Sequence, residues 1–226
     1  MRVAALLACF FGCLLTAPSI LSGQTSDGIL ADRLLSDDEF FLLATCGAAP
    51  GGPCSGPAPR WDKPTLRLAL KTDGMTLPDD FVPRLEAAIS AALDQINGVH
   101  AGITITKVVD QPADITVRPT ALAEGTDMAT IPGSDIAGIL GVGFMTLWWD
   151  DREVITKAEI LISIGITDTD LPSAMLEEIT QSLGFLHDID GPAYEGISIL
   201  SQTSNATTTI EGQDAALLHW LSPPKD

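Results

Sequence analysis

The chain has 226 residues, of which 46% are hydrophobic, and its formal net charge is −18 at pH 7. A surface this negative should repel nucleic acid and anionic membranes. Nucleic acid is therefore not expected as a partner. A chain of this length supports one domain with a real core, but not comfortably two.

The first 24 residues have the layout of a cleavable signal peptide. Arg2 is followed by an apolar run over 3–15 and then by small and turn-forming residues such as Pro18. An uncleaved anchor is the alternative, because the apolar stretch reaches about 20 residues if Pro18 is tolerated inside it. Lipid attachment is a weaker alternative, since Cys9 has too short an apolar lead-in and Cys13 has poor flanking residues. We therefore predict an exported protein, periplasmic or secreted, with no membrane contact after cleavage.

Residues 25–60 are predicted to be a lead-in segment with one short helix over 38–45. The two cysteines that remain after cleavage, Cys46 and Cys54, bracket a turn-rich loop of Gly, Ala and Pro residues. In an oxidising compartment this spacing predicts a Cys46–Cys54 disulfide, and two free thiols are the alternative.

From residue 61 the hydrophobic pattern alternates between strand and helix periods. Leu66, Leu68 and Leu70 alternate as in a half-buried strand, whereas the apolar residues over 80–98 recur at helical spacing. The pattern predicts strands over 65–70, 103–108, 114–117, 141–149 and 154–164, a loop over 119–135, and helices over 80–98, 171–186 and 211–221. The strands over 141–149 and 154–164 form either an edge hairpin or two sequential strands. This order indicates one α+β domain over 61–222, a mixed sheet covered by helices.

The helix over 171–186 has two unlike faces. On a helical wheel Met175 and Ile179 lie on one side, while Glu177, Glu178 and Gln181 gather on the other. Periodicity alone favours a solvated polar face.

The twelve residues from Glu177 to Asp188 resemble the extended zinc-binding motif of the metzincin metallopeptidases, H-E-x-x-H-x-x-G-x-x-H, without a gap. In that motif the histidines bind zinc, the glutamate is the general base and the glycine turns the chain out of the helix. Glu178 matches the base, Gly184 the turn and His187 the third ligand. Glu177 and Gln181 stand at the first two ligand positions.

The resemblance extends beyond the helix. Metzincins and matrixins have a strand before the active-site helix, and Ala158–Ile162 resembles it. They also have a tight turn with a methionine below the metal. Ser198, Ile199 and Leu200 match this turn, with Leu200 in place of the methionine. An uncharacterised family of exported bacterial proteins with a zincin-like domain is similar through Arg60–Pro64 and Glu177–Gly184. The resemblance implies a mixed, mostly parallel twisted sheet with an antiparallel edge strand, a long packing helix and an active-site-type helix, in a bacterial protein.

The substitutions argue against an ordinary zinc site. A histidine, a glutamate and an amide are a poor ligand set for zinc, and calcium or magnesium would need about six oxygen ligands. The first hypothesis is therefore a metal-free, catalytically degenerate domain with no cofactor that binds a peptide or protein, for example along an edge strand near Trp148 and Trp149. The alternative is an active zinc metallopeptidase with Glu177, Gln181 and His187 as ligands and Glu178 as base. His187 alone is equally suited to the dipole at a helix C-terminus.

Overall fold

The computed structural model describes residues 28–132, 136–202 and 206–221. The predicted signal peptide over 1–24 lies outside these ranges. Within them, no helix is long and apolar enough to cross a bilayer.

A five-stranded sheet forms the centre of the fold, with the strand order β3-β2-β4-β6-β5. Neighbouring strands run parallel, except for β5, which is antiparallel to β6 and ends the sheet. The prediction of an α+β fold with a mixed, mostly parallel sheet and an antiparallel edge strand is confirmed. The strands are β2 (Thr65–Leu70), β3 (Thr104–Lys107), β4 (Ile115–Thr120), β5 (Gly143–Trp149) and β6 (Ile155–Ser163).

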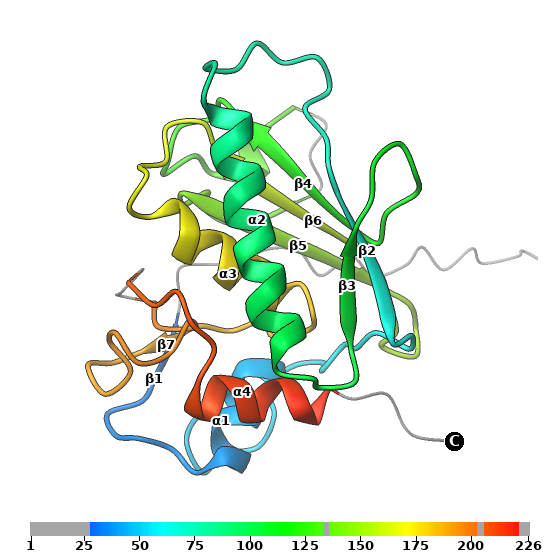
Figure 1. The fold of residues 1–226 in the computed structure, drawn as a ribbon. Coiled ribbons are helices and arrows are strands. Elements are labelled where there is room, and N and C mark those ends of the chain that lie inside the picture. The colour runs from blue at the N-terminus through cyan, green and yellow to red at the C-terminus, as the bar shows by residue number, and fades with distance from the viewer. Residues whose placement is uncertain (1–27, 133–135, 203–205, 222–226) are drawn as a thin grey trace, which may run out of the picture.

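Helices α2 and α3 pack against this sheet, while α1, α4 and a short second sheet lie in the lower part of the view in Figure 1. Helices α2 and α3 pack against each other, and α3 contacts β5, while α1 packs against α4. The bounds are α1 (Asp37–Cys46), α2 (Phe81–Gly98), α3 (Leu171–Gln181) and α4 (Gly212–Trp220), with a 3-10 turn over Met128–Thr130 and a parallel pair of β1 (Ile29–Leu30) and β7 (Ile189–Asp190).

Helix α2 shows how the sequence pattern becomes packing. Its apolar stripe, which includes Leu85, Ile89 and Ile96, is buried, as amphipathic spacing predicts. At its last turn the Asn97 side chain donates to the Ile105 carbonyl (2.9 Å) and accepts from the Ile105 amide (2.8 Å), which fixes the helix end to β3.

The hairpin alternative for the last two strands is confirmed. β5 and β6 pair antiparallel through a tight turn, in which the Asp150 carboxylate accepts from the amides of Arg152 (2.9 Å) and Val154 (3.0 Å). The Lys157 ammonium lies 4.2 Å from the Trp148 ring centroid. These contacts account for the aromatic and acidic residues here as parts of the hairpin.

Two predicted bounds are wrong. Helix α3 ends at Gln181, not at residue 186, and β4 continues to Thr120, into the predicted 119–135 loop, which also contains the 3-10 turn. The apolar pattern continues through Leu186, but the helix cannot, because Gly184 has a φ of +119°, which is incompatible with an α-helix.

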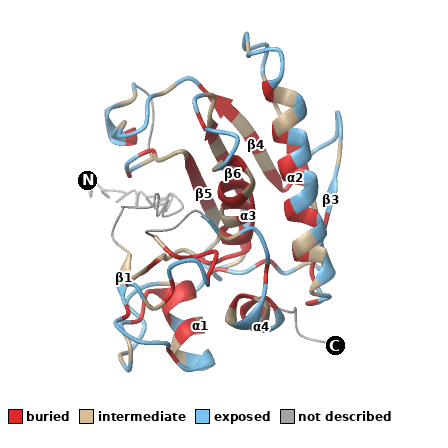
Figure 2. Cartoon of the chain, turned by 60° about the vertical axis from the view of Figure 1, so that its left-hand side comes forward, coloured by how far each residue is buried: buried red, intermediate tan, exposed pale blue. Residues whose placement is uncertain are grey.

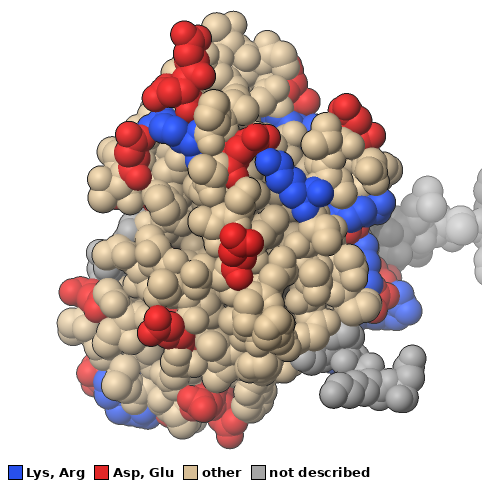
Figure 3. Space-filling view, in the orientation of Figure 1, with Lys and Arg blue, Asp and Glu red and all other residues tan. Residues whose placement is uncertain are grey.

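The buried interior extends from the sheet to the lead-in segment (Figure 2). Phe40 and Leu43 of α1 belong to the same core as the strands and α2. The predicted helix of the lead-in is thus confirmed and docks on the rest of the molecule. Acidic side chains are spread over the face shown in Figure 3 rather than gathered in one patch.

Candidate functional site

Helix α3 is buried around most of its circumference, on its polar side as well as its apolar side (Figure 2). Glu178 is 5% exposed and Gln181 is fully buried. The expectation of a solvated polar face is therefore wrong. The reason lies in the tertiary packing: α2 covers one flank of α3 and β5 covers another.

Glu178, at the position of the general base, points at the start of β5. A methyl group built on Gly143 would collide with Glu178 Oε1, so only glycine leaves room for this carboxyl. Its other oxygen, Oε2, is buried and has no hydrogen-bond partner among the described residues. Burial, and then the nearby Asp188 carboxylate, raise the pKa of Glu178 well above its ordinary value.

Gln181, at the second ligand position, is bonded to a residue beyond the helix end. Its Nε2 donates to Asp188 Oδ1 at 2.6 Å. Burial raises the pKa of Asp188 to about 6, although the Gln181 bond opposes the rise. Burial, Asp188 and Glu178 together raise the pKa of the half-buried Glu177 well above its ordinary value. The Asp188 carboxylate, which Gln181 contacts, is thus close enough to act electrostatically on both Glu177 and Glu178.

The chain leaves α3 through Gly184, as the motif predicts. A methyl group on Gly184 would collide with the Pro59 carbonyl, and the residue has a positive φ of +119°. The Ala44 carbonyl of α1 then accepts from the amides of Leu186 (2.8 Å) and His187 (3.2 Å). These bonds place His187 at the C-terminal end of α1.

His187 packs against the disulfide loop. A methyl group on Gly47 would lie 2.8 Å from His187 Nε2, so the ring sits directly over this glycine. Burial lowers the pKa of His187. Burial therefore favours the neutral imidazole, which is the form that can ligate a metal.

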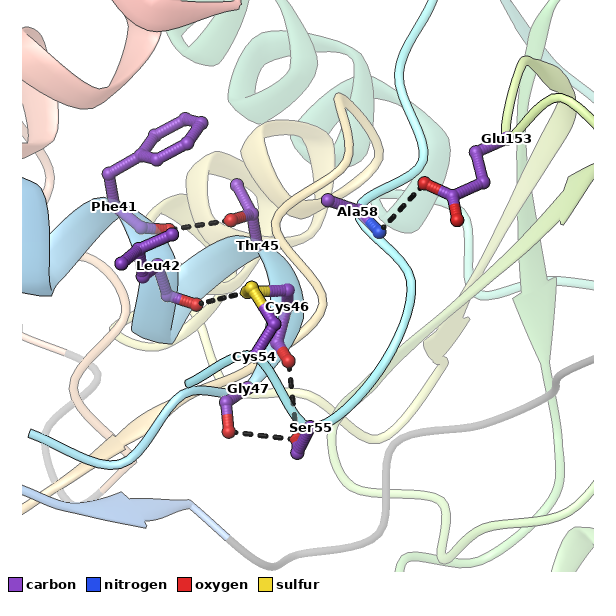
Figure 4. The surroundings of a disulfide bond; sticks show 9 residues. All are labelled: Phe41, Leu42, Thr45, Cys46, Gly47, Cys54, Ser55, Ala58 and Glu153. Atoms are coloured by element: carbon purple, nitrogen blue, oxygen red, sulfur yellow. Dashed lines mark hydrogen bonds between the residues drawn. A yellow bond between two sulfur atoms is a disulfide. The ribbon is translucent and has the colours of Figure 1, made fainter. Parts of the chain in front are cut away.

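The predicted disulfide is confirmed (Figure 4). Cys46 and Cys54 are joined with their Cα atoms 5.2 Å apart. Directly after the loop that they close, Ser55 Oγ donates to the carbonyl of Gly47 inside it at 2.9 Å. The disulfide thus fixes the surface against which His187 rests.

The turn expected below the site is held by α4. Asp214 Oδ1 accepts from Ser198 Oγ (2.7 Å) and its Oδ2 from the Ile199 amide (2.9 Å). The Leu200 carbonyl accepts from the amide of Ile189, two residues after His187 (2.8 Å). The turn over Ser198, Ile199 and Leu200 is therefore tied to the segment that follows His187.

The residues at the three ligand positions do not fit zinc. One of them is an amide, whose nitrogen is already bonded to Asp188, and an amide oxygen is a weak zinc ligand beside imidazole or thiolate. Within the described ranges, no three His, Cys, Asp or Glu side chains gather in a way that could hold a metal ion.

Sequence reasoning missed three residues that build this site. Asp188, which directly follows His187, accepts the hydrogen bond from Gln181. Gly47 makes room for His187, and Gly143 makes room for Glu178. Only the position of Asp188 beside the motif could have pointed to it. Nothing local distinguishes the two glycines from ordinary loop and strand-edge glycines.

Comparison with known proteins gives little further information. No protein-family model and no curated protein matches the chain. Among solved structures it is similar to myroilysin, a metallopeptidase, at 15% sequence identity and a TM-score of 0.30. The match covers 70% of this chain and 52% of myroilysin, so the chain spans about half the length of that protein. A TM-score this low supports no argument about activity.

Proposed function

We propose that this chain is an exported zincin-like domain that has lost zinc-dependent catalysis and binds a peptide or protein. The observation that carries the proposal is the state of Gln181. This side chain is fully buried and bonded to Asp188, at the helix position where the metzincin motif has its second histidine. An amide engaged in an internal hydrogen bond serves the structure of the site rather than metal chemistry.

The arrangement of the elements supports the zincin-like part of the proposal. The sheet is mostly parallel with one antiparallel edge strand, and α2 is the long helix packed beside α3. Helix α3 is followed by the glycine turn, His187 and the 198–200 turn, in the order that the motif resemblance implies. These features support a zincin-like plan that lacks the zinc ligands.

Export is supported by two features. The Cys46–Cys54 disulfide is of the kind that persists in oxidising compartments. The sequence over 1–24 has the charge and apolar pattern of a signal peptide.

Strand addition is the binding mode that suits this architecture. β5 is the terminal strand, and its outer edge pairs with no other strand in the part of the chain that the structure describes. An extended peptide main chain can hydrogen-bond to such an edge, which gives affinity without any catalytic group.

Panning a random peptide library against the immobilised protein tests this proposal. Peptides that bind by strand addition use alternate backbone N–H groups. N-methylation of one alternate set should therefore abolish binding, while methylation of the other set should leave it intact. Equal effects of the two methylation patterns, or no saturable peptide, would reject strand addition.

The same peptides separate binding from catalysis. We expect every selected peptide to remain intact during long incubation with the protein, whether or not zinc is added. Zinc-dependent cleavage that disappears in Glu178→Gln would instead establish the metallopeptidase alternative, with Glu178 as its base.

A further inference from the structure

A cavity of about 620 Å³ lies between the residues that precede α1, the 194–198 segment and the start of α4. Its volume is within the range of small-ligand sites. It is lined neither by α3 nor by His187, and it touches the predicted 198–200 turn only at Ser198. The cavity is therefore a separate site from the one at α3 and does not depend on the function proposed for that site.

One wall of the cavity is apolar. Leu34, Leu35 and Ile197 line it, and of these Leu34 is 59% exposed and Ile197 is 60% exposed. Exposed aliphatic side chains beside a cavity offer surface to the apolar part of a ligand. A ligand with a short hydrocarbon stem can cover them.

The polar wall contains acceptors that are not fully used. Asp214 is 2% exposed, and each of its oxygens has one described donor, Ser198 Oγ and the Ile199 amide. A carboxylate has about four acceptor positions, so Asp214 can take further donors. Glu211, an exposed residue, adds a second carboxylate to the lining.

The donors around the cavity are mostly engaged. The Tyr194 hydroxyl donates to Gln213 Oε1 (3.0 Å), and Gln213 Nε2 donates to the Leu35 carbonyl (3.0 Å). No lysine, arginine or histidine lines the cavity among the described residues. The lining thus has two carboxylates without a cation, which is the pattern that complements a positively charged donor.

We propose that this cavity binds an alkylammonium group, whose ammonium faces Asp214 and Glu211 and whose stem lies against Leu34 and Ile197. A lysine side chain of a polypeptide and a free primary amine present the same chemistry.

Titration of the purified protein with n-butylamine at pH 7.5, followed by amide NMR signals, tests the proposal. We expect saturable shifts at Ile197 and Gln213, and none with 1-butanol, which has the stem without the charge. An equal response to 1-butanol, or no saturable response to butylamine, would overturn the proposal.

Two matched variants localise the site. Glu211 caps α4 without a side-chain hydrogen bond, so Glu211→Gln keeps the helix start intact. This change should weaken butylamine binding about twofold to fivefold, the range for an exposed ion pair. Glu124→Gln, at an exposed position outside the cavity lining, should leave binding unchanged. Equal losses in both variants would show that only general surface charge attracts the amine, and would overturn the proposal.

The tripeptide acetyl-Gly-Lys-Gly-amide identifies the source of the ligand. If it binds more tightly than butylamine, a lysine of a polypeptide is the ligand. If butylamine binds and the tripeptide does not, the ligand is a free amine.

Discussion

The carboxyl groups of Glu177 and Glu178 on α3, and of Asp188 just after it, lie in an environment that opposes their ionisation. Burial disfavours the charged form of Asp188, which accepts a hydrogen bond from buried Gln181, and the Asp188 charge adds to burial in raising the pKa values of Glu177 and Glu178. The site is thus a cluster of acids with raised pKa values rather than a set of metal ligands around one cation.

This environment makes stability depend on pH. The pKa of Asp188 is raised to about 6, so the folded chain binds more protons than the unfolded chain between about pH 4 and pH 6. The contribution of Asp188 to the free energy of unfolding is therefore greatest near pH 4 and falls as the pH rises towards 6.

Asp188→Asn isolates this effect, because the amide oxygen can still accept from Gln181. We expect the variant to be more stable than the wild type by about 3 kcal/mol at pH 7.5, and the difference to vanish near pH 4. Denaturant unfolding at the two pH values measures both. A variant less stable than the wild type at pH 7.5 would show that the ionised form of Asp188 stabilises the site.

Among the elements, the exit from α3 depends on one glycine. Gly184→Ala adds a methyl group against the Pro59 carbonyl at a positive φ, so we expect it to lower the free energy of unfolding by about 3 kcal/mol or more. Gly196→Ala has a similar backbone requirement, with φ +67°, but meets no atom within 4 Å. It should cost about 1 kcal/mol. Equal losses of unfolding free energy in the two variants would mean that the chain around Pro59 moves away from the added methyl group at little cost.

The disulfide loop is the second element on which the site depends. Replacing Cys46 and Cys54 by alanine should lower the free energy of unfolding by about 2–3 kcal/mol for so short a loop. The pKa of His187 should rise toward its ordinary value, because the disulfide no longer holds Gly47 and its loop against the ring. An NMR titration of His187 checks the second effect, and an unchanged pKa would show that the loop keeps its place without the disulfide.

For the whole molecule, the local hydrophobic pattern predicts where helices and strands lie better than it predicts which residues pack against them. Alternation of Leu66, Leu68 and Leu70 located β2 correctly, and helical spacing located α2. Periodicity could not show that the polar side of α3 is buried, because the α2 and β5 residues that cover it are distant in the chain. Nor could it reveal that Gln181 and Asp188 meet, since the contact spans the turn at Gly184.

We propose that the zincin-like chain has a buried polar network where related metallopeptidases have their metal site. Elemental analysis of the purified protein, after incubation with excess zinc and desalting, tests this claim most directly, with His187→Ala as the matched control. We expect far less than one zinc ion per chain, with no difference between the two proteins. About one zinc ion per chain in the wild type, lost in His187→Ala, would contradict it.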